Sequence, residues 1–179
     1  MKQKDFTIPI RRNILEYVAI LCWFLGMNWF LATGAFSPNV FSAIIVLGCW
    51  AKAVLFGAEN LKQLLDAARS NLQHHRFLIL MGINMSQMIL SFALDFYLLY
   101  RMDTGSFAGV TSSVSQAEAL FDFFYLSTLN FCFFGYSDIL PQTVPAKIVN
   151  LTEIVLAFVT VIFLLSDFIS LKESLRESE

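Results

Sequence analysis

Four long apolar runs, separated by polar segments, dominate the pattern of this chain. They cover residues 13–36, 40–57, 77–100 and 146–171. A helix of about 20 apolar residues, rising 1.5 Å per residue, is long enough to cross the ~30 Å hydrocarbon core of a bilayer. The pattern therefore predicts an all-α membrane protein with four transmembrane helices.

The segment between the second and third runs has a different pattern. Over residues 58–76, apolar side chains recur at helical spacing with charged residues on the opposite face; they are Leu61, Leu64, Leu65, Ala68 and Leu72. This is typical of an amphipathic helix. We expect it either to lie on the membrane surface or to continue a spanning helix into water.

A second short helix is predicted between the third and fourth runs. After a polar stretch over residues 101–114, Ser115 and Glu118 have the spacing of a capping box, in which each side chain satisfies a free backbone amide at the helix start. The helix should run from Gln116 to about Phe131. At this length it is short for a helix that must cross the bilayer and return.

A polar interruption, Gly135 to Asp138, follows that helix inside an otherwise apolar stretch. Irregular backbone at membrane depth is tolerated only where it is buried in protein or lines a water-filled cavity. The segment therefore predicts a re-entrant loop that dips into the bilayer and lines a path.

Composition supports a membrane protein and excludes several other classes. The chain is 57% hydrophobic and 15% charged, whereas soluble domains are about 45–50% apolar and about 25% charged. A net charge of −2 gives no indication of nucleic acid as a partner. No nucleophile–base set, zinc-protease motif or phosphate loop indicates an enzyme, and no cofactor or metal is expected. Cys22, Cys49 and Cys132 are expected to be small buried hydrophobes.

The distribution of Lys and Arg predicts the orientation in the membrane. Most basic residues fall in the N-terminal segment, in residues 58–76 and in the tail, and few fall in the intervening loops. By the positive-inside rule we expect both termini to be cytoplasmic, in a cell or inner membrane. A cytoplasmic regulator is a possible further partner.

The stretch LSTLNFCFFGYSDILP, residues 126–141, resembles the pore loop of potassium channels, whose pattern is TTVGYGD followed by ITP. Gly135 and Tyr136 match it, as do Asp138, Ile139 and Pro141. The resemblance covers residues 77–171 and implies a homotetramer in which backbone carbonyls coordinate a dehydrated K⁺ or Na⁺ ion. It divides the chain into a two-helix unit (1–57), a linker helix (58–76), a pore module (77–171) and a tail (172–179).

The filter departs from the family pattern in its inner half. The segment CFFGYSD comprises the predicted ion path: Cys132, Phe133, Phe134, Gly135, Tyr136, Ser137 and Asp138. Phe133 replaces the family's Thr, and four such rings would form a hydrophobic constriction. Ser137 replaces a Gly, which would place it in a strained left-handed conformation. We expect a pore that selects poorly for potassium or is tightly gated, unless Phe133 and Phe134 repack behind a normal filter.

The resemblance also assigns supporting roles. Filter support is expected from Tyr125, Asp95 and Glu153, and pore lining from Ala157, Val161, Leu165 and Asp167. An acid inside a span faces a partner, water or the headgroups. Asp95 therefore either braces the short helix or the region of Glu153, or reaches the interface.

Two other charged residues have simpler expected environments. Lys52 should extend to the inner surface, without pairing with Asp95, and Glu16 should be solvated or paired with Arg11 or Arg12. Two alternatives to a conducting pore stay open. One is a non-conducting scaffold or sensor with the same tetrameric fold. The other is an unrelated four-helix membrane protein, such as a carrier subunit.

Overall fold

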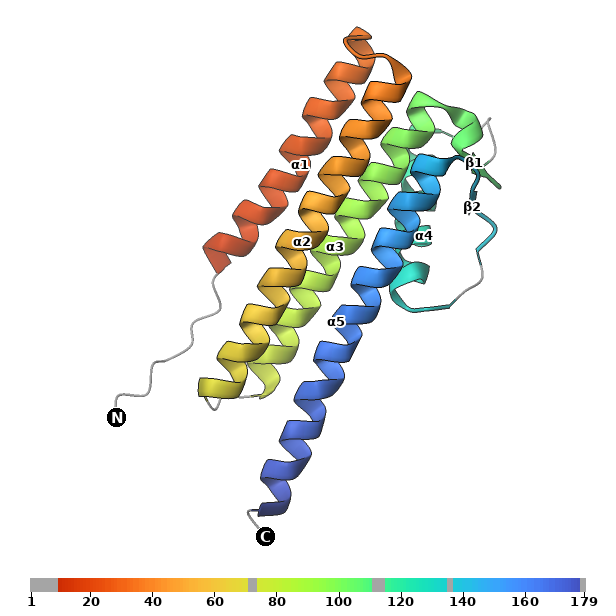
Figure 1. Ribbon diagram of the computed structural model, residues 1–179. Coiled ribbons are helices and arrows are strands. Elements are labelled where there is room, and N and C mark those ends of the chain that lie inside the picture. Colours follow the sequence, from red (N-terminus) through yellow and green to blue (C-terminus); the bar gives the residue numbers. More distant parts are fainter. Residues whose placement is uncertain (1–9, 71–73, 111–114, 135–136, 178–179) are drawn as a thin grey trace.

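The computed structural model describes residues 10–70, 74–110, 115–134 and 137–177. Four long helices lie side by side in an up-and-down bundle (Figure 1): α1 (Ile10–Thr33), α2 (Pro38–Ser70), α3 (His74–Met102) and α5 (Val144–Glu177). Each contains a segment long and apolar enough to cross a membrane. The four predicted spanning helices are thus confirmed, and they indicate an integral membrane protein.

The chain between α3 and α5 forms a small side unit. It contains η1 (Thr104–Ser106), β1 (Phe107–Ala108), α4 (Gln116–Phe131) and β2 (Leu140–Pro141). The strands pair antiparallel, with Phe107 opposite Pro141 and Ala108 opposite Leu140. The side unit lies near the end of the bundle where α3 ends and α5 begins. We call this the loop end, and the opposite end, where α1 begins, the terminal end.

α3 is the central helix of the structure. About 56% of the residues in its most apolar segment are buried, compared with 11% in α1. Phe96 of α3, Phe107 of β1 and Phe123 of α4 pack edge-on or tilted, with ring centroids 4.9 Å apart for Phe107–Phe123 and 5.6 Å for Phe96–Phe107. Such aromatic pairs add to the stabilisation from buried area. They fix the side unit on α3.

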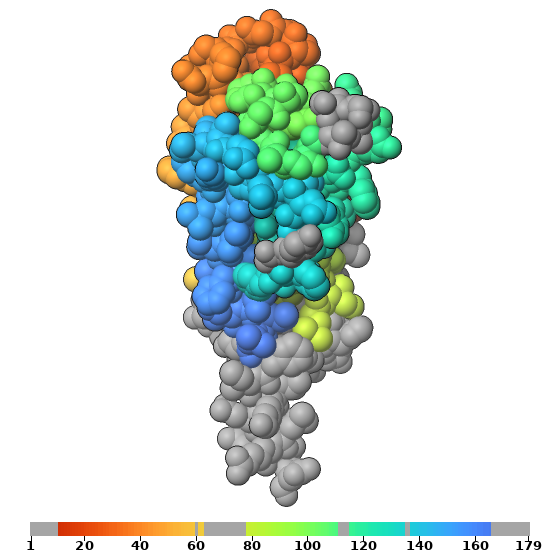
Figure 2. Space-filling model, turned by 90° about the vertical axis from the view of Figure 1, so that its right-hand side faces the viewer, coloured from red at the N-terminus to blue at the C-terminus, as the bar shows by residue number. Residues whose placement is uncertain are grey.

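The turn between α1 and α2 follows from local sequence. Gly34 has φ of +64°, and the N–H groups of Gly34 and Ala35 bond to the carbonyls of Leu31 and Phe30. This is a Schellman motif, which ends a helix with a left-handed residue, usually Gly. Pro38 then occupies the first position of α2, where its missing N–H costs nothing. The turn projects beyond the end of α3 (Figure 2).

Residues 58–70 belong to α2, which continues without a break to Ser70, and α3 begins at His74. Of the two alternatives for the amphipathic segment, the structure therefore shows the continuation of a spanning helix. The expected burial of all three cysteines is wrong, because only Cys49 is buried. Cys22 and Cys132 are exposed in the described structure.

Candidate functional site

α4 begins with the predicted capping box. The Ser115 side chain accepts a hydrogen bond from the Glu118 N–H, and the Glu118 carboxylate accepts one from the Ser115 N–H at 2.8 Å. Hydrogen bonds from the Ser115 backbone and hydroxyl lower the pKa of Glu118. The negative charge also suits the positive end of the helix dipole. The start of α4 is thereby fixed at the loop end.

The buried face of α4 reaches the middle of the bundle. Ser127 Oγ lies 2.9 Å from the Ile89 carbonyl of α3. Ile89 is 13 residues before Met102, the last residue of α3, and so lies about 20 Å from the loop end at 1.5 Å per residue. The chain then returns to the loop end, where β2 pairs with β1. α4 therefore descends beside α3 to the level of Ile89, and β2 lies again at the loop end.

A buried carboxylate holds the C-terminal part of α4 against α5. Glu153 of α5 is fully buried; Ser127 donates to its Oε1, and Asn130 Nδ2 donates to its Oε2 at 2.6 Å. The same Asn130 amide donates to Asn150 Oδ1 at 2.9 Å. Buried polar groups must be hydrogen-bonded. Glu153 thereby links α5 to α4, and its role in supporting a filter stays a prediction.

α4 ends in a second Schellman motif. The N–H of Phe133 bonds to the Asn130 carbonyl (3.2 Å), and that of Phe134 bonds to the Leu129 carbonyl (3.1 Å). Phe133 takes the left-handed position with φ of 52°. Placing an L-residue there costs roughly 1–2 kcal/mol. The strained residue of the loop is therefore located at the end of the helix.

The expected left-handed conformation of Ser137 is wrong. Among the described non-glycine residues, only Phe133 has a positive φ. Ser137 Oγ instead accepts a hydrogen bond from the Ile139 N–H at 3.1 Å, which stabilises a local turn.

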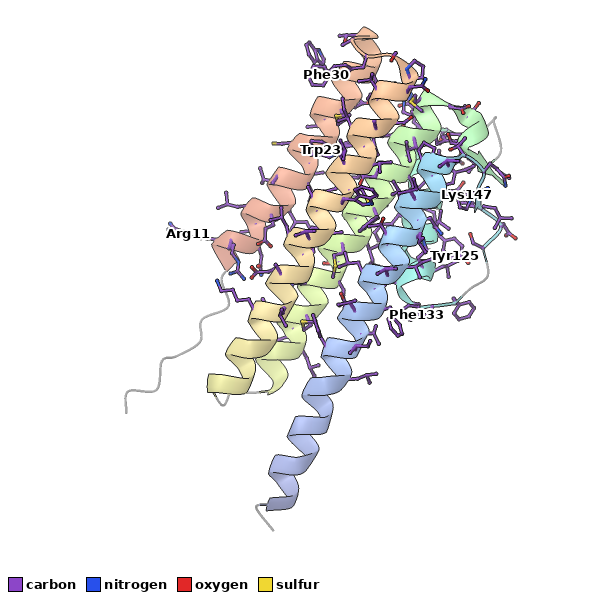
Figure 3. The ribbon with its side chains drawn as sticks, in the orientation of Figure 1. Arg11, Trp23, Phe30, Tyr125, Phe133 and Lys147 are labelled. Carbon is purple, nitrogen blue, oxygen red and sulfur yellow. The ribbon has the colours of Figure 1, made fainter. Side chains whose placement is uncertain are left out.

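Most of the described side chains of the predicted ion path are exposed in the single chain. The Phe133 ring packs near-perpendicular to Phe158 of α5, with centroids 6.2 Å apart (Figure 3). Phe134 is 73% exposed, and Cys132 and Asp138 are also exposed. Both Phe133 and Phe134 are therefore exposed in the single chain. Gly135 and Tyr136, the best match to the family pattern, lie outside the described residues.

Asp95 makes an ion pair that the sequence analysis did not predict. It is fully buried, and its Oδ2 lies 2.5 Å from Lys52 Nζ of α2. The prediction that these residues do not pair is wrong because α2 begins beyond the end of α3, which brings Lys52 to the level of Asp95. Asp95 is therefore not interfacial. Its other oxygen and the indole nitrogen of Trp23 are buried and have no hydrogen bond of ordinary geometry in the described structure, although the Trp23 indole lies close enough to interact with this carboxyl group.

The residues of α5 that were predicted to line a pore differ in their exposure within the chain. Ala157 is fully buried against its own chain, so it cannot line a path outside that chain. Val161 is half-buried, and Leu165 is exposed. The side chain of Asp167 lies outside the described residues. The free face of α5 is an apolar stripe at helical spacing, made of Val144, Leu151, Val155, Phe158, Ile162 and Leu165.

α4 also presents an exposed aromatic face. Phe121, Phe124 and Tyr125 are all accessible, at helical spacing. Tyr125 extends from α4 away from the four-helix bundle (Figure 3). The aromatic face and the free stripe of α5 belong to elements that contact each other. A large accessible apolar surface of this kind suits contact with lipid or with another protein chain.

Several residues of the site escaped the sequence analysis. Ser127, Asn130 and Asn150 carry the hydrogen bonds around Glu153. In the sequence these three residues stand out only as polar residues within apolar stretches. The packing of α4 on α5 is needed to show that they contact Glu153 or one another. The pairing of Glu16 with Arg12, at 3.5 Å, is confirmed. Arg12 also contacts Glu59 of α2.

These features define a class: an integral membrane protein of four long helices, held by buried polar contacts, with a short helix and loop on one side. The chain matches no protein-family model, and comparison with curated proteins and with solved structures finds no similar protein. The resemblance to potassium channels therefore depends on the residues of the pore-like segment alone.

Proposed function

We propose that the chain forms a homotetrameric, potassium-channel-like cation pore in a cell or inner membrane, with α4 as the pore helix and residues 132–138 as the ion path. The observation that carries the proposal is the course of α4. It starts at the loop end, reaches the middle of α3 at Ile89 and is followed by a return to β2. In a membrane this course is a re-entrant loop, which lipid does not tolerate unless protein or a water-filled path surrounds it.

The exposed surfaces support assembly around the side unit. α5 carries an apolar stripe along its length, and α4 carries three accessible aromatic residues. Figure 2 shows α5 and the loop segments on one face of the molecule. Neighbouring copies packed on this face would surround the end of α4. The partial negative charge at a helix C-terminus would then favour a cation on the axis.

Phe133 is the residue that should limit conduction. It lies at the C-terminus of α4, its ring contacts Phe158 on the free stripe of α5, and 45% of it is exposed. A ring of four such side chains is a hydrophobic constriction that gates by dewetting. The pore should therefore conduct K⁺ or Na⁺ weakly and with little preference between them.

Conductance and subunit count test the proposal together. The purified chain is reconstituted in planar bilayers, and the reversal potential is measured with K⁺ on one side and Na⁺ on the other. Native mass spectrometry gives the number of subunits. Phe133→Thr should increase the current, whereas Phe121→Thr, an exposed aromatic at the start of α4, should not. A monomer or dimer, or strong potassium selectivity, would overturn the corresponding part of the proposal.

A non-conducting scaffold or sensor is the second candidate. The aromatic side chains at the end of α4 favour it, because Phe134 is accessible and apolar where a filter would need to admit ions. This candidate predicts a tetramer that carries no current even with Phe133→Thr. An unrelated four-helix membrane protein predicts no fourfold symmetry at all.

A further inference from the structure

A cavity of about 400 Å³ lies between α1 and α2, in the half of these helices nearer the terminal end. α1 packs chiefly on α3, and α1 and α2 separate towards the terminal end (Figure 1). The two helices come together at Trp23 and Gly48, where a side-chain carbon at position 48 would lie within 2.5 Å of the Trp23 ring. Towards the loop end, the cavity ends at this contact.

The length of the cavity matches one leaflet of a bilayer. Its wall on α2 extends from Gly48 to Glu59, about 16 Å at 1.5 Å per residue. The apolar span of α2 runs from Pro38 to Glu59, so Gly48 falls near its middle. Half of a hydrocarbon core of ~30 Å is about 15 Å. The volume divided by the length gives a mean cross-section of roughly 25 Å², which suits a single extended hydrocarbon chain.

The charged side chains of the cavity wall already have partners. Glu16 and Glu59 both contact the guanidinium of Arg12. Lys52, in the middle of the wall, lies 2.5 Å from the Asp95 carboxylate. Burying a further charge beside these pairs would cost free energy without a new partner to offset it. An occupant of the cavity therefore does not need a charged group inside it.

The surface that remains is mostly apolar and extends to the outside of the bundle. Asn84 and Gln87 line the cavity from α3, but they are only 3% and 1% exposed and so contribute little of its surface. Ala19 of α1 and Ala51 of α2 line it and are exposed. Apolar cavities stay dry and bind apolar molecules. Beside two membrane-spanning helices, the apolar molecules at hand are lipid chains.

We propose that one acyl chain of a phospholipid, from the leaflet at the terminal end, occupies this cavity. The methyl end of the chain lies against Trp23, and the headgroup lies beyond Glu16 and Glu59 at the membrane surface. The chain fills the space that α1 and α2 leave between them, so the lipid is part of the packing of α1 on the bundle. The inference concerns α1–α3 and does not depend on the proposed pore.

Phospholipids with brominated chains test the site, because bromine quenches tryptophan fluorescence on contact. The full chain carries Trp29→Phe and Trp50→Phe, which leaves Trp23 as the reporter, and is placed in phosphatidylcholine vesicles. Bromines near the methyl end of the acyl chains should quench Trp23 at least twofold more than bromines near the carbonyl. Equal quenching by the two lipids would overturn the proposal. Quenching by aqueous acrylamide and not by brominated lipid would also overturn it, because the cavity would then hold water.

Two substitutions separate the chain in the cavity from lipid elsewhere around the protein. Ala51→Leu occupies the cavity and should lower the quenching of Trp23 at least twofold. Ala43→Leu, on the same helix but on the loop-end side of Gly48, should leave it unchanged. Both alanines are exposed, so the larger side chain does not overpack the core. Equal quenching in the two variants, each with wild-type helicity, would overturn the proposal.

Native mass spectrometry provides a second measure that needs no quencher. Phosphatidylcholine is counted per chain after extraction in mild detergent. The unsubstituted chain and Ala43→Leu should each retain one phosphatidylcholine more than Ala51→Leu. Ala19→Leu, which narrows the cavity from α1, should lose the same molecule. If the unsubstituted chain retains no phosphatidylcholine, or if all four chains retain equal numbers, the cavity does not hold a lipid chain.

Discussion

Removing the lysine of the buried ion pair should destabilise the bundle far more than removing another lysine of the same helix. Lys52→Met leaves the Asp95 carboxylate without its cation in a position where it is fully buried. Lys62 provides the matched control because it lies on α2 and is exposed. The comparison therefore separates burial and pairing from the general effect of losing a positive charge.

The expected magnitude follows from two independent estimates. Breaking a buried ion pair by removing one partner costs about 3–5 kcal/mol, and an acid at the centre of a membrane helix costs about 2.5–3.5 kcal/mol. We expect Lys52→Met to lower the free energy of unfolding by about 3 kcal/mol on these grounds. Lys62→Met should change it by less than about 0.5 kcal/mol.

The partner substitution should cost less, for a structural reason. The Lys52 side chain is 16% exposed, so without Asp95 the flexible ammonium can reach water. Asp95→Asn should therefore cost about 1–2 kcal/mol, close to a lost hydrogen bond to a charged group. The double variant should be no less stable than Lys52→Met alone, because the unpaired carboxylate is gone. The coupling energy between the two sites should be about 2 kcal/mol.

The free energy of unfolding is measured in mixed micelles by circular dichroism while the fraction of denaturing detergent rises. The wild type, the two single variants and the double variant together form a double-mutant cycle. Each variant must first show wild-type helicity. The reasoning would be refuted if Lys52→Met and Lys62→Met were equally stable, or if the two single effects added with no coupling. It would also be refuted if Asp95→Asn cost more than Lys52→Met.

Four further predictions concern the side unit and the helices. Phe133→Gly should be neutral or stabilising by up to about 1 kcal/mol, because relief of the left-handed backbone (roughly 1–2 kcal/mol) offsets the lost contact with Phe158; thermal unfolding should show no such benefit for Phe134→Gly. Gly109→Ala should destabilise by more than about 1 kcal/mol, because φ is +89° and the new carbon would lie 1.9 Å from a backbone oxygen. Gly26→Ala, with open space around it in α1, should instead stabilise by about 0.5–1 kcal/mol in the same assay. The lowered pKa of Glu118 means that its charged form stabilises the start of α4 above its ordinary pKa of 4.5, and that this stabilisation is lost as the pH falls through the lower folded value. Glu118→Gln cannot titrate, so the difference in unfolding temperature between it and the wild type should change only in the acid range; a difference independent of pH would contradict this.

The sequence allowed the helices to be predicted well because their signals are local. The four spans follow from apolar length, and the start of α4 follows from Ser115 and Glu118. The meeting of Lys52 with Asp95 could not be predicted in the same way. It depends on how far α2 extends past α3, and a shift of one helical turn moves a side chain by about 5.4 Å. Non-local registers of this kind are set by packing, which no spacing in the sequence records.

The two ends of the pore-like segment are fixed independently of its filter residues. At the loop end, β1 pairs with β2, and Gly109 allows the backbone of Asp138 to approach closely. At the other end, Asn130 holds the C-terminus of α4 to Glu153 of α5. α1 ends in the same Schellman motif with Gly34, without strain, whereas α4 tolerates Phe133 in that position. Strained residues persist where the surroundings over-determine the backbone. The anchors at both ends supply that constraint, so the course of the loop depends little on the residues that differ from the family pattern. The path of the chain and the chemistry of the filter can therefore vary separately, and a measured loss of potassium selectivity would be no evidence against the fold.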